Sequence, residues 1–271
     1  MISKNKIKSY LNKSVSSNPV ILGIDKTSFG HSAGNIFEEW TFNNLKSKDS
    51  NFEIWRPNEF LNLAVQQNNG NSITKSLTQT WWADLHFNSK IKDVINYDRT
   101  QQDGADLLLH YGDTKTILTN MNNVILINVK SHNADKDGRD PNILSAYRLL
   151  KFLNGVLHNK NPQKNLNRIS YWIIGFSYKY DKIIKQTKIT EVNVKDLFLL
   201  DVDSMPNINF DSAIQIQWHP SKMSEIHNQS KKQFVDKLVD KFDHAWIKHK
   251  TSKDERFNTL LGDIKGFLDT I

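Results

Sequence analysis

The stretch that decides the fold runs from Asp103-Gly-Ala-Asp106-Leu-Leu-Leu109 to Leu126-Ile-Asn128-Val-Lys130-Ser131. Both segments contain short apolar runs next to turn-forming residues, a pattern that predicts two neighbouring buried strands. Side chains alternate between the faces of a strand, so Asn128 and Lys130 project from the same face. We therefore expect an acid before the first strand to lie beside an amide and an ammonium group on the second.

These three groups suit the hydrolysis of a phosphodiester. Carboxylate and amide oxygens are ligands of Mg²⁺, and a lysine can stabilise or help deprotonate a water molecule beside the phosphate. The same residues also have a plainer interpretation, because an Asp at the start of a strand and a Lys at its end are commonly solvated. Taken alone, the residues favour this plainer interpretation over a metal site.

The remaining pattern predicts a mixed α/β (α+β) domain. We expect helices over about 32–45, from Pro141-Asn142 onwards, and over about 231–249, with further strands over 169–178 and 213–218. On the second helix the expected apolar face comprises Ile143, Ala146, Tyr147, Leu150 and Leu153. No linker divides the chain, so we expect one domain over residues 1–271, with 1–25 as an N-terminal extension and 225–271 as a C-terminal helical segment.

Composition narrows the class of protein. The 271 residues contain 36 Lys and Arg against 29 Asp and Glu, a net charge of +7 that permits a nucleic-acid partner or another polyanion. The absence of cysteine excludes disulfides, Cys-ligated zinc sites, iron–sulfur clusters and thiol catalysis. The apolar runs are far shorter than the roughly 20 residues of a membrane span. We expect a soluble cytoplasmic protein. The segment 112–116 lacks the first glycine of a phosphate loop, so no ATP dependence is expected.

Five blocks between about residues 30 and 219 carry a more specific signal. They are Gly30-His-Ser-Ala-Gly34 with Phe37-Glu38, Gln101 to Leu109, Asn128-Val-Lys130, Asp140-Pro-Asn-Ile-Leu-Ser-Ala-Tyr147, and Ile208-Asn209 with Gln215-Ile-Gln-Trp-His219. In this order they resemble the HincII-like type II restriction endonucleases of the PD-(D/E)XK superfamily. The superfamily motif occurs by chance in many proteins, whereas Pro-Asn-Ile-x-Ser-Ala-Tyr and Gln-Ile-Gln-aromatic-His are far more specific.

The resemblance implies a restriction-endonuclease-like core, in which helices flank a mixed central sheet, and a Mg²⁺-dependent site at which Mn²⁺ can substitute. Asp106 matches the metal-binding aspartate, Lys130 matches the catalytic lysine, and the Val129 carbonyl would be a further metal ligand. Asn128 stands where the family has a second acid. An amide keeps the oxygen but loses the charge, so metal binding would be weaker or altered in geometry. Asn128 is interpreted either as a natural variant or as an engineered Asp→Asn change.

The resemblance also implies roles outside the motif. Glu38 matches a glutamate that would join the site through water, although it can equally be a solvated helix acid. Asn142 and Asn209 match asparagines that contact bases, and Asn142 can instead simply begin its helix. Gln101 matches a glutamine near the minor groove. Arg139 stands where the family has a glutamine that wedges between bases, and its guanidinium can instead stack or bind phosphate.

Taken together, the resemblance implies a prokaryotic homodimer that cuts double-stranded DNA at a short palindrome. A six-base site of the GTYRAC kind with blunt ends is favoured, and a methyltransferase would protect the same site in the cell. Two-fold symmetry of the protein is the counterpart of the palindrome. Two other functions stay open. One is a repair or recombination nuclease that reads DNA structure, and the other is a DNA-binding protein whose cutting is weakened by Asn128.

Overall fold

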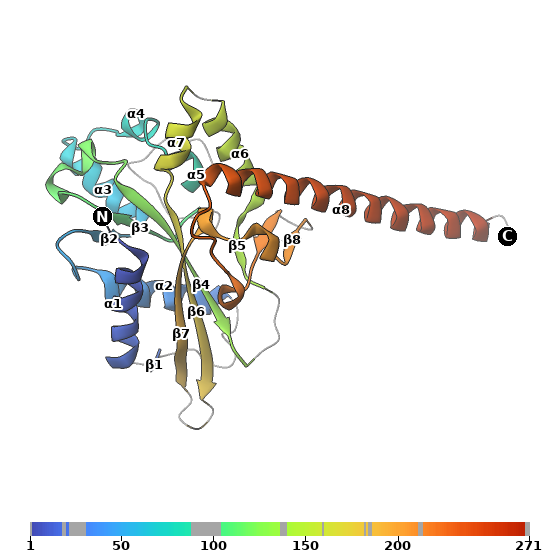
Figure 1. The fold of residues 1–271 in the computed structure, drawn as a ribbon, viewed down its shortest axis with the longest axis horizontal. Coiled ribbons are helices and arrows are strands. Elements are labelled where there is room, and N and C mark those ends of the chain that lie inside the picture. The colour runs from blue at the N-terminus through green and yellow to red at the C-terminus, as the bar shows by residue number, and fades with distance from the viewer. Residues whose placement is uncertain are drawn as a thin grey trace.

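A computed structural model describes residues 2–17, 20–21, 31–87, 104–135, 140–158, 160–181, 183, 186–210 and 214–268. Helices cover both faces of one mixed β-sheet, and a smaller sheet lies beside it (Figure 1). The α-helices are α1 (Lys4–Ser17), α2 (His31–Leu45), α3 (Pro57–Gln67), α4 (Thr74–Leu77), α5 (Ala83–His86), α6 (Ala146–Leu157), α7 (Pro162–Arg168) and α8 (Lys231–Leu268). Short 3₁₀ helices are η1 (Thr114–Thr119), η2 (Leu197–Leu199), η3 (Val202–Ser204) and η4 (Pro220–Lys222).

The large sheet is mixed, as the sequence predicts. In spatial order its six strands are β1 (Val20–Ile21), β7 (Gln186–Asp196), β6 (Tyr171–Asp181), β4 (Val124–Asn133), β3 (Leu107–His110) and β2 (Glu53–Trp55). Strands β4 and β6 pair in parallel, and the other neighbours within the described ranges are antiparallel. The two strands expected around the polar groups are thus β3 and β4, which pair directly.

Both faces of the large sheet are buried. Along β4, Leu126 belongs to one core cluster with residues of α3, α6 and α8, whereas Ile127 and Val129 belong to a second cluster with residues of α1 and α2. Burial on both faces explains why β3 and β4 read as continuous apolar runs instead of alternating ones. The polar Asn128 therefore interrupts a strand that is otherwise fully apolar from Val124 to Val129.

Helix α1 contributes directly to the second cluster. Ile7 and Leu11 are fully buried, and the helix packs against β7 and α2. An ion pair between Lys4 and Glu225 also joins it to the segment before α8. The N-terminal residues that we expected to form an extension therefore supply part of the core.

A second, three-stranded sheet contains β5 (Asn142–Ser145), β9 (Gln215–Gln217) and β8 (Asn207–Asn209), with β9 in the middle. The expected helix start at Pro141-Asn142 is therefore wrong. Pairing with β9 holds residues 142–145 extended, and α6 begins only at Ala146, where the Ser145 side chain accepts a hydrogen bond from the Arg148 N–H at 3.3 Å. Tyr147, which we placed on the apolar face, is 65% exposed.

The C-terminal helix is longer than expected. Helix α8 continues to Leu268, and its 38 residues span about 57 Å at 1.5 Å per residue. Phe234, Leu238 and Phe242 are buried against the body, while the distal part projects away from it (Figure 1). None of the described helices combines the length and the apolar character needed to cross a bilayer.

Candidate active site

The segment that leads to Asp106 is held by a close backbone contact with the end of α5. The Gly104 N–H donates to the His86 carbonyl at 2.7 Å, and a Cβ on Gly104 would lie only 2.2 Å from the Leu85 carbonyl oxygen. Only glycine fits such a close approach of two backbone segments. The Asp106 N–H then donates to the Ile127 carbonyl at 2.8 Å, which fixes the residue against β4.

The Asp106 carboxylate faces the neighbouring strand. Its Oδ2 accepts a hydrogen bond from the Val129 N–H at 2.6 Å. Since Leu107 pairs with Ile127, continuation of the register sets Asp106 opposite Asn128. The N–H and C=O of one strand residue point to the same neighbouring strand, so the Val129 carbonyl also lies on the Asp106 side of β4. The structure thus brings Asp106, Asn128 and Val129 together.

Among the described residues, the amide nitrogen of Asn128 has a hydrogen-bond partner and its amide oxygen has none. The residue is 4% exposed, and its Nδ2 donates to the Tyr171 hydroxyl at 3.1 Å. Within the part of the chain that is described, its Oδ1 is buried and has no hydrogen-bond partner. A buried acceptor without a partner costs about 1–3 kcal/mol. Such an oxygen suits a cation or a water molecule, so the amide fits a metal site.

Tyr171 sets the orientation of that amide. Its hydroxyl donates to the Gly104 carbonyl, so the hydroxyl oxygen is left as an acceptor for Asn128. Burial first, and then the nearby Asp106 carboxylate, raises the pKa of the Tyr171 hydroxyl above its ordinary range. The tyrosine therefore stays protonated, and the amide oxygen of Asn128 points away from it.

Lys130 lies two residues along β4 on the same face as Asn128. It is half-buried, and no described residue forms a hydrogen bond or an ion pair with its ammonium group. Its register partner on β6 is Gly175, against which Pro220 packs. With no partner among the described residues, the ammonium group is available to a ligand or a water molecule.

The donor set is made of oxygen. Among the described residues there is no cluster of three or more His, Asp or Glu side chains that could hold a metal ion. What this site offers is one carboxylate, one amide oxygen and one backbone carbonyl, from Asp106, Asn128 and Val129. Oxygen ligands of this kind suit hard cations such as Mg²⁺, which usually keeps several water molecules and takes few protein ligands.

Glu38, also singled out from the sequence, lies on a helix and not on β3 or β4. Glu38 is partly exposed on α2, and the adjacent Phe37 packs with its ring 5.2 Å from Phe176 in the second core cluster. Helix α2 thus covers the face of the sheet opposite to Asn128 and Lys130. Gln101 and Arg139 lie outside the described residues.

Asn142 and Asn209 are brought into one sheet. Asn142 begins β5 opposite Gln217, and Asn209 ends β8 opposite Gln215, so the two asparagines flank β9. Asn142 is exposed, and its Oδ1 accepts a hydrogen bond from Gln217 Nε2 at 3.0 Å. The suggestion that Asn142 begins a helix is wrong, because Ser145 is the residue that caps α6.

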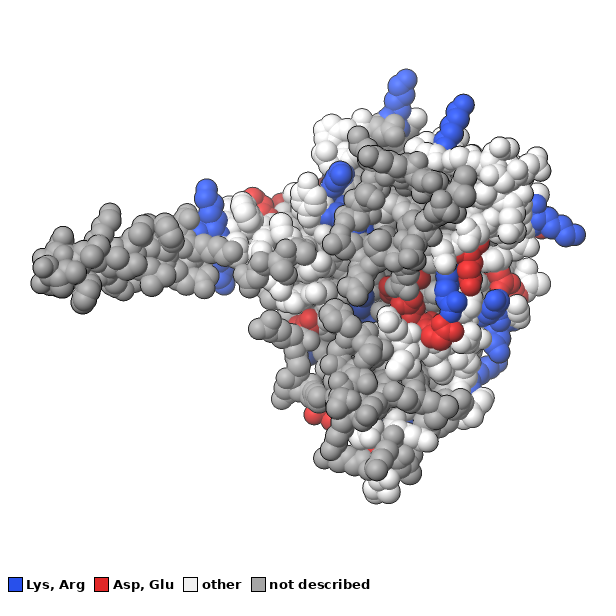
Figure 2. Space-filling model, turned by 180° about the vertical axis from the view of Figure 1, so that it is seen from behind, with Lys and Arg blue, Asp and Glu red and all other residues white. Residues whose placement is uncertain are grey.

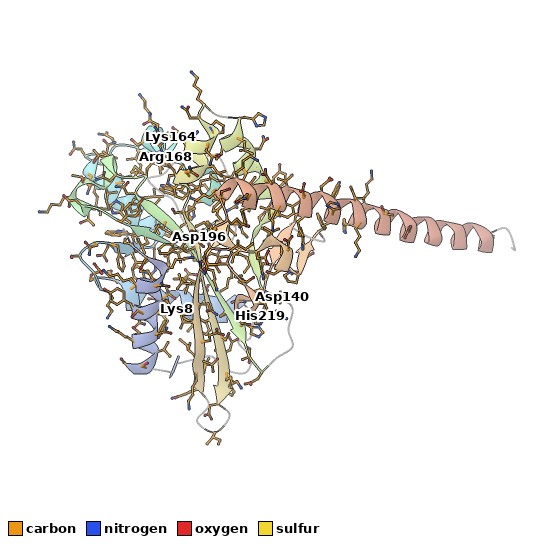
Figure 3. All side chains as sticks on the ribbon, viewed as in Figure 1. Lys8, Asp140, Lys164, Arg168, Asp196 and His219 are labelled. Carbon is orange, nitrogen blue, oxygen red and sulfur yellow. The ribbon has the colours of Figure 1, made fainter. Side chains whose placement is uncertain are left out.

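Two histidines that sequence reasoning did not pair join this small sheet to β4. The rings of His132 and His219 are 3.7 Å apart at their centroids, and Asp140 lies next to His219 (Figure 3). Burial is the main cause that lowers the pKa of each imidazole, followed for His132 by the charge of His219. His219 Nδ1 accepts a hydrogen bond from the Ser221 N–H at 3.2 Å, so one nitrogen of the ring is engaged within η4. The available signal was the position of His132, two residues after Lys130.

The charge of the protein is not gathered into one patch on the face seen in Figure 2. Acidic and basic side chains of the described residues lie next to one another there. Ion pairs such as Arg56 with Glu39 and Lys6 with Asp49 set acidic side chains among the basic ones. The candidate site is therefore identified by its geometry and not by a basic patch.

Comparison with known proteins places this geometry in a family. The family model described as restriction endonuclease HincII matches residues 11–259. The chain belongs to the HincII restriction endonuclease family. The type II restriction enzyme HincII of Haemophilus influenzae is 24% identical over 232 residues, which cover 79% of this chain and 80% of that enzyme. Membership of the HincII family implies a nuclease whose substrate is DNA.

The HincII family match also agrees with the fold. The mixed sheet flanked by helices is the restriction-endonuclease architecture expected from the sequence. The matched region begins within α1 and ends within α8, so it includes residues on both sides of the blocks recognised in the sequence.

Proposed function

We propose that this HincII-family protein is a type II, site-specific deoxyribonuclease of the PD-(D/E)XK superfamily that uses Mg²⁺. One observation carries the proposal: the Asp106 carboxylate is fixed by the Val129 N–H at 2.6 Å, opposite an Asn128 whose buried Oδ1 has no partner among the described residues. The carboxylate, the amide oxygen and the Val129 carbonyl thus belong to neighbouring positions of two directly paired strands, and Lys130 projects from the same face as Asn128.

Each residue has a distinct role in this proposal. Asp106, the Asn128 amide oxygen and the Val129 carbonyl would hold the metal. Bound Mg²⁺ would neutralise the charge that develops on the phosphate and would activate a water molecule. Lys130 orients the attacking water and offsets negative charge at the scissile phosphate. Glu38, which is partly exposed on α2, is proposed as an accessory acid that acts through water.

The substrate would be a short palindrome in double-stranded DNA, read by a homodimer in which each subunit cuts one strand. We propose a site of the GTYRAC kind with blunt cutting, and a methyltransferase as the cellular partner that protects the same site. The residues proposed to contact DNA are Gln101, Arg139, Asn142 and Asn209.

Digestion of plasmid DNA over a tenfold series of Mg²⁺ or Mn²⁺ concentrations, followed by sequencing of the fragment ends, tests this function. We expect discrete fragments whose ends share one palindromic sequence, and no cutting with a chelator present. Cutting confined to branched DNA would instead identify a structure-specific nuclease. Sedimentation of the protein with a short duplex tests the homodimer, which predicts two chains per duplex.

A second function is favoured by one observation, the amide at Asn128. The site has one negative charge fewer than a site with two acids, so a DNA-binding protein with weak cutting also fits it. Tight binding of a labelled site without nicking at any Mg²⁺ or Mn²⁺ concentration would establish this second function. Recovery of cutting by Asn128→Asp would then separate a weakened enzyme from a protein that only binds.

A further inference from the structure

One face of the small sheet is lined by uncharged amide side chains. Leu144, Ile208 and Ile216 point into the core with at most 6% exposure. Along β8 and β9, Asn209, Gln215 and Gln217 alternate with Ile208 and Ile216 and therefore lie on the other face. Asn142 and Ser145 lie on that face too, because they pair with Gln217 and Gln215, and four of these five described residues carry amide groups. Amide groups both donate and accept hydrogen bonds, which makes such a face suited to reading the edges of bases.

This amide face is fixed relative to the candidate active site. Strand β9 leads through Trp218 to His219, whose ring contacts His132, two residues after Lys130 on β4. The next residue, Pro220, packs so closely on Gly175 that a Cβ there would lie 2.5 Å from the proline Cβ. A shift of the small sheet would therefore disturb the contact with β4, the strand that bears Lys130.

Gln217 determines which end of the Asn142 amide faces outward. Gln217 Nε2 donates to Asn142 Oδ1 at 3.0 Å, so the oxygen is engaged within the sheet. No residue in the described part of the chain accepts a hydrogen bond from Asn142 Nδ2, and Asn142 is exposed. Asn142 therefore presents N–H donors to whatever lies over the sheet.

An outward donor discriminates between bases. In the major groove, only guanine offers two adjacent acceptors, N7 and O6, whereas adenine has one acceptor, N7, beside the N6 donor, thymine has O4 alone, and cytosine N4 is a donor. Paired recognition of adenine by asparagine needs both the amide oxygen and the amide nitrogen. With its oxygen engaged by Gln217, Asn142 is set for an acceptor edge instead.

We propose that Gln217 is a positioning residue for sequence recognition, which holds the Asn142 amide so that Asn142 selects guanine at one position of each half-site. This inference rests on the proposed function, because it assumes that the protein reads duplex DNA. Gln217 acts through Asn142 and need not touch the base itself.

Gln217→Glu tests the proposal most sharply. A carboxylate of the same shape accepts hydrogen bonds but cannot donate one to Asn142 Oδ1. The Asn142 amide is then expected to turn, donate to Glu and present its oxygen to the DNA. On a plasmid library with randomised bases, the preference for guanine over adenine or cytosine should fall about tenfold at one position per half-site. All other positions should keep their preference.

A second variant and a matched control complete the test. Gln217→Met can neither donate nor accept, so it leaves the Asn142 amide free to turn and should weaken the preference at the same position by less than Gln217→Glu does. Gln163→Glu makes the identical change in an exposed amide pair on α7, where Gln163 Nε2 donates to Asn167 Oδ1 at 3.3 Å. This control should leave every base preference unchanged.

The possible outcomes distinguish failure of the positioning role of Gln217 from failure of the proposed function. If the wild-type protein cuts at a defined site and both Gln217 variants keep the wild-type preference at every position, the positioning role is wrong while the nuclease function stands. If the wild-type protein binds a defined site without cutting, selection of bound sequences from the same library gives the same readout. A wild-type protein that neither cuts nor binds any defined site contradicts both the function and the inference.

Discussion

The Tyr171 hydroxyl accepts a hydrogen bond from Asn128 Nδ2 at 3.1 Å, and this contact decides how the candidate site presents its second oxygen. The tyrosine gives its only proton to the Gly104 carbonyl, in the segment that leads to Asp106. One buried hydroxyl thus links the segment before β3 to the amide on β4. Asn128 belongs to this network, since a tyrosine oxygen acting as an acceptor needs an N–H donor facing it.

Removing the hydroxyl group of Tyr171 should lower both the stability and the activity of the protein. Tyr171→Phe leaves the Asn128 N–H and the Gly104 carbonyl without partners in a buried place, so the free energy of unfolding should fall by roughly 2–4 kcal/mol. Urea unfolding measures this change. Tyr111→Phe, at a site 39% exposed, is the control and should change stability by less than about 0.5 kcal/mol. Equal stability of the Tyr171 variant and the wild type would show that the hydroxyl is not part of such a network.

Asn128→Asp should lower the stability of the metal-free protein and raise its affinity for Mg²⁺. The added charge should lower the Mg²⁺ concentration needed for half-maximal cutting by roughly tenfold or more. The second carboxylate oxygen would, however, face the Tyr171 hydroxyl, which must leave the Gly104 carbonyl in order to donate to it. We therefore expect the metal-free variant to unfold more easily, which urea unfolding tests, and calorimetry to show tighter Mg²⁺ binding. Unchanged binding of Mg²⁺ would mean that Asn128 does not contact the metal.

The core of this site was predictable from the sequence because it depends on two strands close in the chain. Alternation along β4 set Asn128 and Lys130 on one face, and pairing with β3 brought Asp106 beside them. Tyr171 was not predictable, since it reaches the site from β6, 43 residues beyond Asn128. The sequence of β4 alone does not specify which tyrosine of a neighbouring strand will form a hydrogen bond with Asn128.

The small sheet was mispredicted for a related reason. Pro141-Asn142 carries a local helix-start signal, but pairing of β5 with β9, more than 70 residues away, overrides it. The same long-range pairing produces the contact between Asn142 and Gln217 and positions His219 over His132. Local patterns therefore identified the strands that bear the candidate site residues, whereas the contacts that orient the side chains came from tertiary pairing.

Lys130 should be needed for cutting but not for binding. Lys130→Ala removes the ammonium group from the face that bears Asn128, so single-turnover cutting should slow by roughly 10²–10⁴-fold. A gel-shift assay should show that the same DNA site is still bound. Lys164→Ala, at an exposed position on α7, is the matched control and should cut normally. Cutting at the wild-type rate by the Lys130 variant would show that another residue performs this role.

The stability of the fold should decline in mild acid. Burial lowers the pKa of His110, a fully buried residue, and also the pKa values of His132 and His219. Below about pH 6.5 these histidines bind protons in the unfolded chain while the folded chain resists them. The free energy of unfolding should therefore be highest above pH 6.5 and fall as the pH drops towards 5. Urea unfolding at several pH values should show a shallower decline for His110→Phe, and an identical slope would mean that His110 does not contribute.

Gly175 and Gly155 should respond oppositely to the same substitution. A Cβ on Gly175 would lie 2.5 Å from the Cβ of Pro220, so Gly175→Ala must push η4 and the adjacent His219 away from β4. We expect a loss of about 1–3 kcal/mol of stability, as overpacking typically costs. Cutting should also slow, because the small sheet is no longer fixed beside Lys130. Gly155 lies within α6 with no atom inside 4 Å of an added Cβ, so Gly155→Ala should stabilise the protein by about 0.5–1 kcal/mol. Thermal unfolding and plasmid cutting of the two variants test this prediction. If Gly175→Ala is as stable and as active as Gly155→Ala, the contact between Pro220 and β6 does not hold the two sheets together.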